Sequence, residues 1–171
     1  MYVEVPVDVL QMNPFTAIGT DGFLITAGSA EKFNTMTASW GSMGVLWGRN
    51  IVTLYVRKSR FTHQFLDEQD GFTVSFFPKE MKDRLLWCGQ HSGREYDKIA
   101  KTGLTTTFIP SPHGGERVTF KQASLVFSCT KAASFDLDPS TFQRSEVKEF
   151  YHDGDLHTVY IGFIDSILSN Q

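Results

Sequence analysis

Cysteine is scarce in this sequence of 171 residues, which contains only Cys88 and Cys129. Two cysteines so far apart cannot build the several cross-links of a disulfide framework, and they lack the paired spacing of a zinc ribbon. We therefore expect both thiols to be reduced and buried, as is typical of a cytoplasmic protein.

Long apolar runs and a basic leader are also missing. No stretch approaches the roughly 18 apolar residues that a membrane-spanning helix needs. The N-terminal segment MYVEVPVDVL carries Glu4 and Asp8 and no basic residue, which is unlike a secretory signal peptide. These absences predict a soluble cytoplasmic protein that has no membrane partner.

The common catalytic and metal-binding motifs do not occur. The sequence has no GxSxG, GxGxxG or Walker pattern, and nothing in it ties serine, histidine and aspartate into a triad. The five histidines (His63, His91, His113, His152 and His157) do not have the spacing of metal ligands, so no metal site is expected.

The charge is slightly acidic but unevenly distributed. The formal net charge of −3 argues against general binding to nucleic acid. Between Lys32 and Leu66, however, there is no acidic residue, while five basic residues are present. A cationic segment in an acidic protein suggests a small anionic ligand, although chance clustering would give the same pattern.

The segments with strand character outnumber those with helical character. The length fits one domain over residues 1–171, and 15 phenylalanines suit a core packed between strands. Six segments are rich in β-branched and aromatic residues. They are 22–27, 35–40, 51–57, 72–77, 123–129 and 158–164. Gly162 interrupts the last of these, which suggests a bulge or a close approach of another group to the backbone.

The expected helices are short. One follows a Thr62 N-cap over 63–68, one covers 79–87, and one begins with the capping-box pattern at Ser92 and ends before Gly103. Many short strands with few helices favour a barrel or a sandwich, because a sheet of this size must protect its edges.

Three segments could hold an anionic ligand. In 33–47, Thr35, Thr37 and Ser39 alternate along a strand and could offer a row of hydroxyl groups to phosphate. The alternative is a row of hydroxyls on an ordinary solvent-facing strand surface.

In 57–62, Arg57 and Arg60 lie between a strand end and a helix start, which combines two guanidinium groups with free amide donors. In 88–98, Ser92, Gly93 and Arg94 offer a hydroxyl, an amide and a cation, and Lys98 would lie one helical turn beyond Arg94. Solvated loop arginines and an ordinary capped surface helix are the alternatives for these two segments.

Four motifs in order resemble one known family. They are the run from Asn34 to Gly41 (NTMTASWG), Arg57-x-x-Arg60-Phe61-Thr62, Ser92-Gly93-Arg94 with Asp97-Lys98, and His157 with Tyr160-Ile161-Gly162. Together they resemble the flavin reductase-like, FMN-binding split-barrel family, and most strongly its flavoredoxin-type members. The resemblance extends from about Gly22 to Ile164.

The resemblance implies a mainly β fold: a six-stranded Greek-key split β-barrel with a few short peripheral helices. It also implies a homodimer with FMN near the subunit interface. The residues it assigns to FMN are Asn34, Thr35, Met36, Thr37, Ala38, Ser39, Trp40, Arg57, Arg60, Thr62, Ser92, Gly93, Arg94 and Lys98. His157 would lie near the flavin ring or the entering nicotinamide, as a candidate catalytic residue.

The sequence departs from the family pattern at two places. Relatives often carry an aromatic residue a few positions after Cys129, where this chain has Lys131-Ala132-Ala133-Ser134. They often have glutamate after the glycine of the YIG motif, where this chain has Phe163. These departures affect the expected electron donor and acceptor more than they affect the expected binding of FMN.

Three functions follow as hypotheses. The first is an oxidoreductase that takes electrons from NAD(P)H through bound FMN to a flavin, a ferric complex or a protein. The second is a flavoredoxin-like FMN electron carrier that a partner protein reduces. The third is a non-redox ligand-binding module built on the same barrel.

Overall fold

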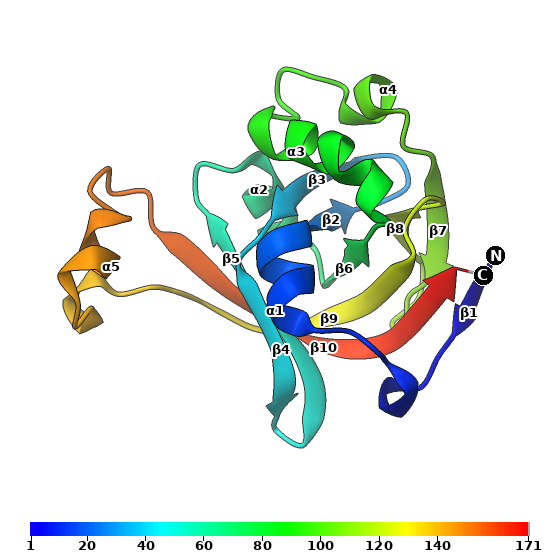
Figure 1. Cartoon of the computed structure of the whole chain (residues 1–171), viewed down its shortest axis with the longest axis horizontal. Coiled ribbons are helices and arrows are strands. Elements are labelled where there is room, and N and C mark those ends of the chain that lie inside the picture. The colour runs from blue at the N-terminus through cyan, green and yellow to red at the C-terminus, as the bar shows by residue number, and fades with distance from the viewer. Residues whose placement is uncertain (171) are drawn as a thin grey trace.

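Strands dominate residues 1–170, which are the part of the chain that the computed structural model describes (Figure 1). Ten strands are found there. Their bounds are β1 (Tyr2–Glu4), β2 (Phe23–Gly28), β3 (Phe33–Ala38), β4 (Gly41–Leu46), β5 (Arg49–Arg57), β6 (Gly71–Phe76), β7 (Thr106–Pro110), β8 (Glu116–Phe120), β9 (Leu125–Asp136) and β10 (His157–Asn170). The predicted mainly β class is therefore confirmed.

Eight of these strands form one antiparallel sheet that curves around a core. Its order is β3-β2-β6-β9-β10-β5-β4, with β1 paired to the last residues of β10. Within residues 1–170 no pairing joins β3 to β4, so the sheet is open between them, where the chain passes through Ser39 and Trp40. Strands β7 and β8 form a separate hairpin.

The six segments that the sequence marks as strands correspond to β2, β3, β5, β6, β9 and β10. The two further strands of the sheet, β1 and β4, have weak local signals. Strand β4 carries Gly41 and Gly44, which by sequence favour a turn, yet it pairs along β5 from Gly41 to Leu46. Tertiary pairing decides such segments, because strand propensity is set largely by neighbouring strands.

Aromatic side chains fill the interior of the curved sheet. Phe72, Val74 and Phe76 alternate along β6 into this core, and Phe127 of β9 joins them. The ring of Phe76 lies 5.3 Å from that of Phe127 and 5.6 Å from that of Phe23, measured between centroids. Tilted and edge-to-face contacts of this kind let flat rings pack across neighbouring strands.

The polar face of β6 is covered by β8 and does not face solvent. The Thr73 hydroxyl donates to the Val118 carbonyl at 2.7 Å, and the Ser75 and Thr119 hydroxyls are 2.9 Å apart. Strand β8 thus satisfies the outward hydroxyl groups of β6, which is what buried polar groups require.

The helices are short and peripheral. They are α1 (Pro14–Thr16), which continues into a short π-helix over Ala17–Asp21, α2 (Phe61–Glu68), α3 (Lys82–Gln90), α4 (Lys98–Thr102) and α5 (Ser145–Glu149). No helix within residues 1–170 is long and apolar enough to cross a bilayer.

Two of the predicted helix starts are wrong. Helix α2 has Arg60 as its N-cap instead of Thr62. The helix expected from Ser92 begins only at Lys98, because the Asp97 carboxylate accepts from the amides of Ile99 and Ala100 and caps the helix there. Gly103 ends it in the left-handed conformation, at φ 64°, as predicted.

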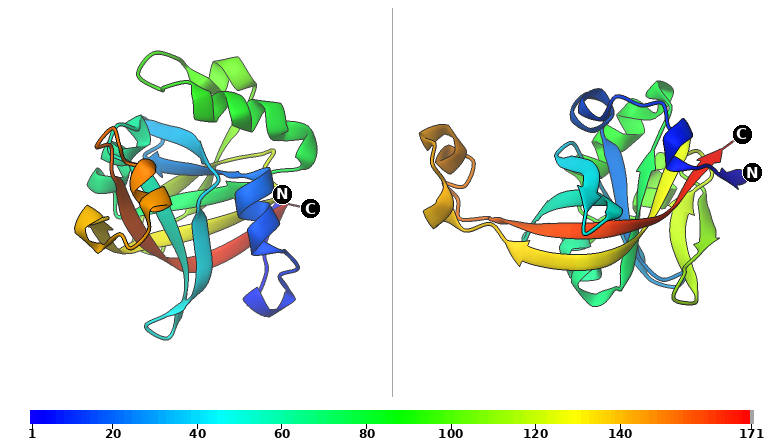
Figure 2. Two further views of the ribbon diagram at one scale, coloured as in Figure 1. Left: turned by 60° about the vertical axis from the view of Figure 1, so that its left-hand side comes forward. Right: turned by 90° about the horizontal axis from the view of Figure 1, so that it is seen from below.

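Strands β9 and β10 extend beyond the barrel and carry an outlying segment, residues 137–156, which contains α5 and which we call the α5 arm. It lies well to one side of the sheet in Figure 1 and in the right view of Figure 2. The arm returns to the barrel at the C-terminal end of β5, where Arg57 Nη2 donates to the Phe150 carbonyl at 2.7 Å.

Gly162 fulfils the expectation of a close approach. The β9–β10 register shifts beside it, and a Cβ at this position would lie 2.4 Å from Cζ of Phe72. A real side chain there would overlap the Phe72 ring in the core.

We therefore predict that Gly162→Ala destabilises the fold by about 1–3 kcal/mol, the range for overpacking a core. Urea unfolding measures this. Gly44→Ala is the matched control, because a Cβ at Gly44 meets nothing within 4 Å. Equal stability of the two variants would contradict the assignment.

Candidate functional site

A cavity of about 410 Å³ opens beside the start of α2, and we call it the cationic cavity. Nine of the residues predicted to bind a cofactor line it: Asn34, Met36, Arg57, Arg60, Thr62, Ser92, Gly93, Arg94 and Lys98. All three candidate segments of the sequence therefore contribute to one site.

Strand β3 presents Asn34 and Met36 to this cavity, whereas Thr35 and Thr37 point to the other side. The Thr35 hydroxyl pairs with Thr26, and the Thr37 hydroxyl donates to the Leu85 carbonyl of α3. Helix α3 covers that face of the strand, so the hydroxyl groups are satisfied within the protein. Thr35, Thr37 and Ala38 do not line the cationic cavity.

The start of α2 supplies the most favourable part of the site for an anion. Its N-cap, Arg60, makes no side-chain hydrogen bond to the first turn. Asn34 Nδ2 donates to the Thr62 hydroxyl at 2.7 Å and thereby fixes β3 against the helix. Free amides at a helix start carry partial positive charge, and the guanidinium of Arg60 adds to it.

The loop after α3 closes the cavity opposite α2. Arg94 Nη1 donates to the Ser59 carbonyl at 3.0 Å, and its guanidinium carbon lies 4.8 Å from the centre of the Phe61 ring. Gly93 is required here, because a Cβ would lie 2.0 Å from Oδ1 of Asn34. Arg60 completes the link by donating to the Gly89 carbonyl at 2.9 Å.

Lys98 is a buried cation in this wall, with only 6% of the residue exposed. Its ammonium donates to the carbonyls of Thr35 and Cys88, each at 2.7 Å. Burial lowers the pKa of Lys98 to about 8, and the charge of Arg60 acts in the same direction. Since Arg94 lies in a turn and not in a helix, the expected one-turn spacing of Arg94 and Lys98 is wrong.

A second cavity of about 550 Å³ lies near the split between β3 and β4, and we call it the apolar cavity. Of the predicted site residues, it contains Ser39 and Trp40. Its other walls include Phe15, Met43, Tyr55 and Tyr151. These aromatic and apolar side chains suit a flat organic ring.

His157 lines neither cavity but contacts two residues of the apolar cavity, Tyr151 and Trp40. Its Nδ1 is 2.8 Å from the Tyr151 hydroxyl, and its ring centroid is 5.2 Å from that of Trp40. Burial, together with the neighbouring charge of Arg57, lowers the pKa of His157 from 6.5 to about 4. The imidazole is therefore neutral near pH 7.

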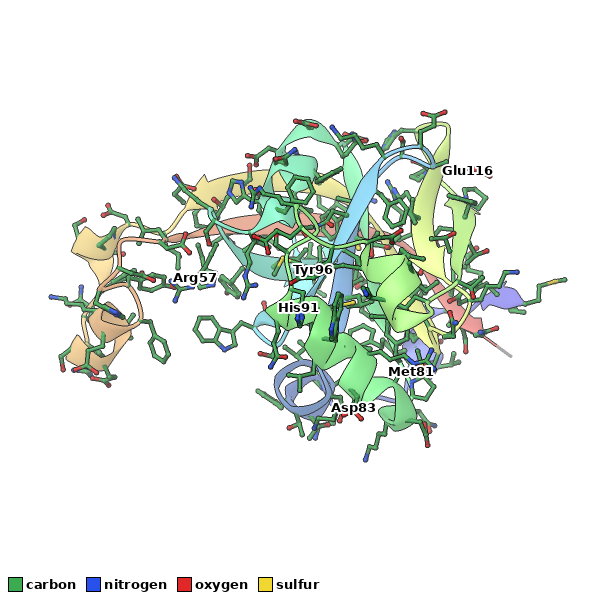
Figure 3. All side chains as sticks on the ribbon, turned by 90° about the horizontal axis from the view of Figure 1, so that it is seen from above. Arg57, Met81, Asp83, His91, Tyr96 and Glu116 are labelled. Atoms are coloured by element: carbon green, nitrogen blue, oxygen red, sulfur yellow. The ribbon has the colours of Figure 1, made fainter. Side chains whose placement is uncertain are left out.

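Three acidic residues that line the cationic cavity were missed by the sequence analysis: Glu95, which follows Arg94, and two residues of the α5 arm. Asp153 and Asp155 line it from the α5 arm, and Arg57 points toward that arm (Figure 3). Arg57 Nη1 donates to the Asp155 carbonyl oxygen at 2.8 Å and lies 3.4 Å from Asp153 Oδ1. No local signal marks the two acids of the arm, because they lie about a hundred residues from the loop that they contact.

An aromatic cluster at the end of α3 was missed as well. The rings of Trp87 and His91 stack at 4.0 Å, and Tyr96 approaches both edge-on. His91 and Tyr96 lie side by side beyond the helix in Figure 3. The cluster joins the residues on either side of the Ser92–Arg94 turn, since His91 precedes the turn and Tyr96 follows it.

Within residues 1–170, no group of three or more histidine, cysteine or acidic side chains could hold a metal ion. The cationic cavity is lined by basic, acidic and polar side chains, and the apolar cavity mainly by aromatic and apolar ones. A sequence model for the flavin reductase like domain matches residues 16–167. The chain belongs to this family.

Solved structures of flavin reductase-like proteins share the fold. Flavoredoxin from Methanosarcina acetivorans has 20% identity and a TM-score of 0.67, with 88% of this chain and 69% of that chain covered. Flavoredoxin of Desulfovibrio vulgaris has 18% identity and a TM-score of 0.66, with 99% and 78% covered.

The NADH:FAD oxidoreductase of Streptomyces globisporus has 17% identity and a TM-score of 0.59, with 87% of this chain and 75% of that chain covered. No curated protein matches the sequence. At these identities the likeness of the solved structures concerns the fold.

The residues that depart from the family pattern, Lys131, Ala133 and Phe163, make their contacts away from the cationic cavity. Lys131 Nζ donates to the carbonyls of Leu66 and Asp67 and so caps the end of α2. Ala133 packs beside Phe163 in a small outer cluster. The ring of Phe163 also lies 4.0 Å from the guanidinium carbon of Arg49.

We predict that His157 stays neutral in the folded protein until the pH approaches about 4. The unfolded chain takes up this proton near the usual pKa of 6.5, so stability is lost as the pH falls from about 6.5 to about 4. Imidazole resonances measured by NMR check this, with His157→Gln to assign the signal. Protonation of His157 in the folded state above pH 6 would contradict the prediction.

Proposed function

We propose that this chain works as a single FMN-binding split-barrel domain and is an oxidoreductase. It would take electrons from NAD(P)H and pass them through FMN to a flavin, a ferric complex or a protein. The observation that carries the proposal is the convergence of Arg57, Arg60 and Arg94 on one cavity at the start of α2, in a member of the flavin reductase-like family.

FMN is the cofactor that this family membership supports, and the residues present fit it. A phosphate monoester needs fixed positive charge and hydrogen-bond donors, which the cationic cavity provides from three chain segments. Two structural neighbours are an FMN-binding protein from Thermus thermophilus and the FMN-binding domain of a flavin reductase-like enzyme from Shewanella baltica.

The two cavities suit the two ends of such a molecule. We assign the phosphate to the cationic cavity, with Arg57, Arg60, Thr62, Ser92 and Arg94 as donors. We assign the ring to the apolar cavity, beside Ser39 and Trp40. Asn34 and Lys98 would act as positioning residues, because their polar atoms hold β3, α2 and α3 together.

Thr35, Met36, Thr37 and Ala38 would contribute through the backbone and packing of β3. The hydroxyl groups of Thr35 and Thr37 are already engaged elsewhere. Gly93 would contribute the close approach of its loop to Asn34. Thr62 is fully buried and its hydroxyl accepts from Asn34, so among the threonines we assign to the cofactor only the backbone amide of Thr62, in the first turn of α2.

The redox chemistry belongs to the cofactor, since the flavin ring supplies hydride acceptance and onward electron transfer when it is bound. The protein would orient the ring and exclude water from one side with Trp40, Tyr55 and Tyr151. His157 would stay neutral beside it and hold the Tyr151 hydroxyl at 2.8 Å. No general base is required for hydride transfer.

A homodimer is part of the proposal. Apolar side chains are exposed near the apolar cavity and on the neighbouring hairpin, namely Phe15, Trp40, Val45 and Trp47. A second copy would cover these side chains and enclose the ring. The combined area of such an interface would be more apolar than an ordinary monomer surface.

An electron carrier is the second candidate. Two of the structural neighbours are named flavoredoxins, and one is named an NADH:FAD oxidoreductase. The carrier would bind FMN in the same cavities but would receive its electrons from a partner protein. The donor separates the two functions.

The absorbance spectrum of the purified protein tests the proposal. We expect it to be yellow, or to become yellow with added FMN, and NADH or NADPH should bleach the flavin band at about 450 nm. Rapid bleaching by a reduced ferredoxin-type protein, without turnover on either nucleotide, would select the carrier. A colourless protein that takes up no FMN would overturn both.

Arg60→Ala should weaken FMN binding by about 1.5–3 kcal/mol, the range for a lost charged hydrogen bond, without unfolding the chain. Fluorescence titration measures the affinity, and thermal unfolding checks the fold. Arg84→Ala removes the same charge from the exposed side of α3 and serves as the matched control. Unchanged FMN affinity with a collapsed melting temperature would show that Arg60 is structural.

A further inference from the structure

The loop between β5 and α2 already binds an anion that belongs to the protein. Asp155 Oδ1 accepts from the Ser59 amide at 3.1 Å, and Oδ2 accepts from the Ser59 hydroxyl at 2.5 Å. A carboxylate therefore occupies two donors of the cationic cavity. The phosphate site proposed above gives no role to the carboxylate of Asp155.

Ser59 offers the type of donor pair that a phosphate oxygen accepts: a backbone amide and a hydroxyl beside a helix start. It lies next to Arg60 in the chain, and both residues line the cationic cavity. The side chain of Asp155 is 23% exposed, so solvent reaches the contact. A contact of this kind can exchange with a ligand in solution.

Asp155 belongs to the α5 arm and not to the barrel. Asp155 follows Gly154, which has a positive φ of 75°, and its own amide donates to Asp153 Oδ1 at 3.1 Å. Arg57 holds the arm through the carbonyl oxygens of Phe150 and Asp155. The turn over 153–155 thus aims its carboxylates at the cationic cavity.

We propose that Asp155 is an internal competitor for the phosphate group of the ligand: its carboxylate holds the Ser59 donors in the unliganded protein and yields them when a phosphate monoester binds. Asp155 thereby lowers the affinity for FMN and favours exchange of the flavin over permanent retention. This inference rests on the proposed function, since it concerns the same site.

The sign of the effect follows from charge. A carboxylate at the cavity wall repels an incoming phosphate dianion, and its two hydrogen bonds must break before phosphate can use the same donors. Asparagine at position 155 would keep the size and one acceptor but remove the charge. Riboflavin has the same ring but no phosphate, so Asp155 should not compete with it for the Ser59 donors.

The test compares Asp155→Asn with the wild-type protein in fluorescence titrations of FMN and riboflavin. We expect FMN to bind roughly five to ten times more tightly to Asp155→Asn, the effect of removing one solvent-screened like charge. Riboflavin affinity should not change. Glu149→Gln removes the same charge from α5, outside the cavity, and should leave both affinities as they are.

Two results would overturn the competition. If Asp155→Asn and Asp155→Ala both bind FMN equally well or more weakly than the wild type, Asp155 positions Ser59 for the ligand instead of competing with it. If FMN and riboflavin tighten equally, the gain does not arise at the phosphate.

Failure of the proposed function would be seen separately, as a wild-type protein that binds no FMN. Calorimetric titration of inorganic phosphate into the wild type and Asp155→Asn then still decides the inference. Tighter phosphate binding by the variant supports it, and an absence of phosphate binding to both proteins overturns it.

Discussion

One buried ammonium group fixes the geometry on which the site depends. Lys98 Nζ donates to a carbonyl of β3 and to a carbonyl near the end of α3, and it lies at the start of α4. Removing an ammonium group from water is costly unless its protons find acceptors, so these contacts define the positions of three segments at once. The Ser92–Arg94 turn is held between α3 and α4 as a result.

Further polar links then close the cationic cavity. Asn34 joins β3 to α2 through Thr62, Arg94 reaches back to Ser59, and Arg60 reaches across to Gly89. Each of these side chains connects segments that are distant in the chain. The basic wall of the cationic cavity is thus cross-linked by hydrogen bonds, while Asp153 and Asp155 come from the arm that lies outside the barrel (Figure 2).

The charge balance of the cationic cavity decides how strongly it holds an anion. Four basic side chains line it, and the carboxylates of Glu95, Asp153 and Asp155 offset them. A cavity with cations alone would retain a phosphate ester tightly, whereas a cavity with built-in acids releases it more readily. The α5 arm therefore contributes two of the charges that line the cationic cavity, Asp153 and Asp155.

The sequence predicted the mainly β fold, because alternating apolar residues and β-branched segments identify strands such as β6 locally. It also identified Arg57, Arg60, Arg94 and Asn34 as a group. The expectation that the hydroxyl groups of Thr35 and Thr37 face the ligand was wrong. Alternation places both residues on one face of β3, but it does not say whether helix α3 or the ligand lies on that face. The expected helix from Ser92 was wrong as well, because the Asp97 cap decides the true start.

The strand periodicity and the chemical character of the three short segments can be read from the sequence alone, because they depend only on residues that are neighbours in the chain. The tertiary structure decided which faces meet in the cationic cavity and that Asp155 reaches Ser59, 96 positions away. Contacts between residues so far apart depend on how the whole sheet curves and where the β9–β10 extension returns, which no local pattern encodes.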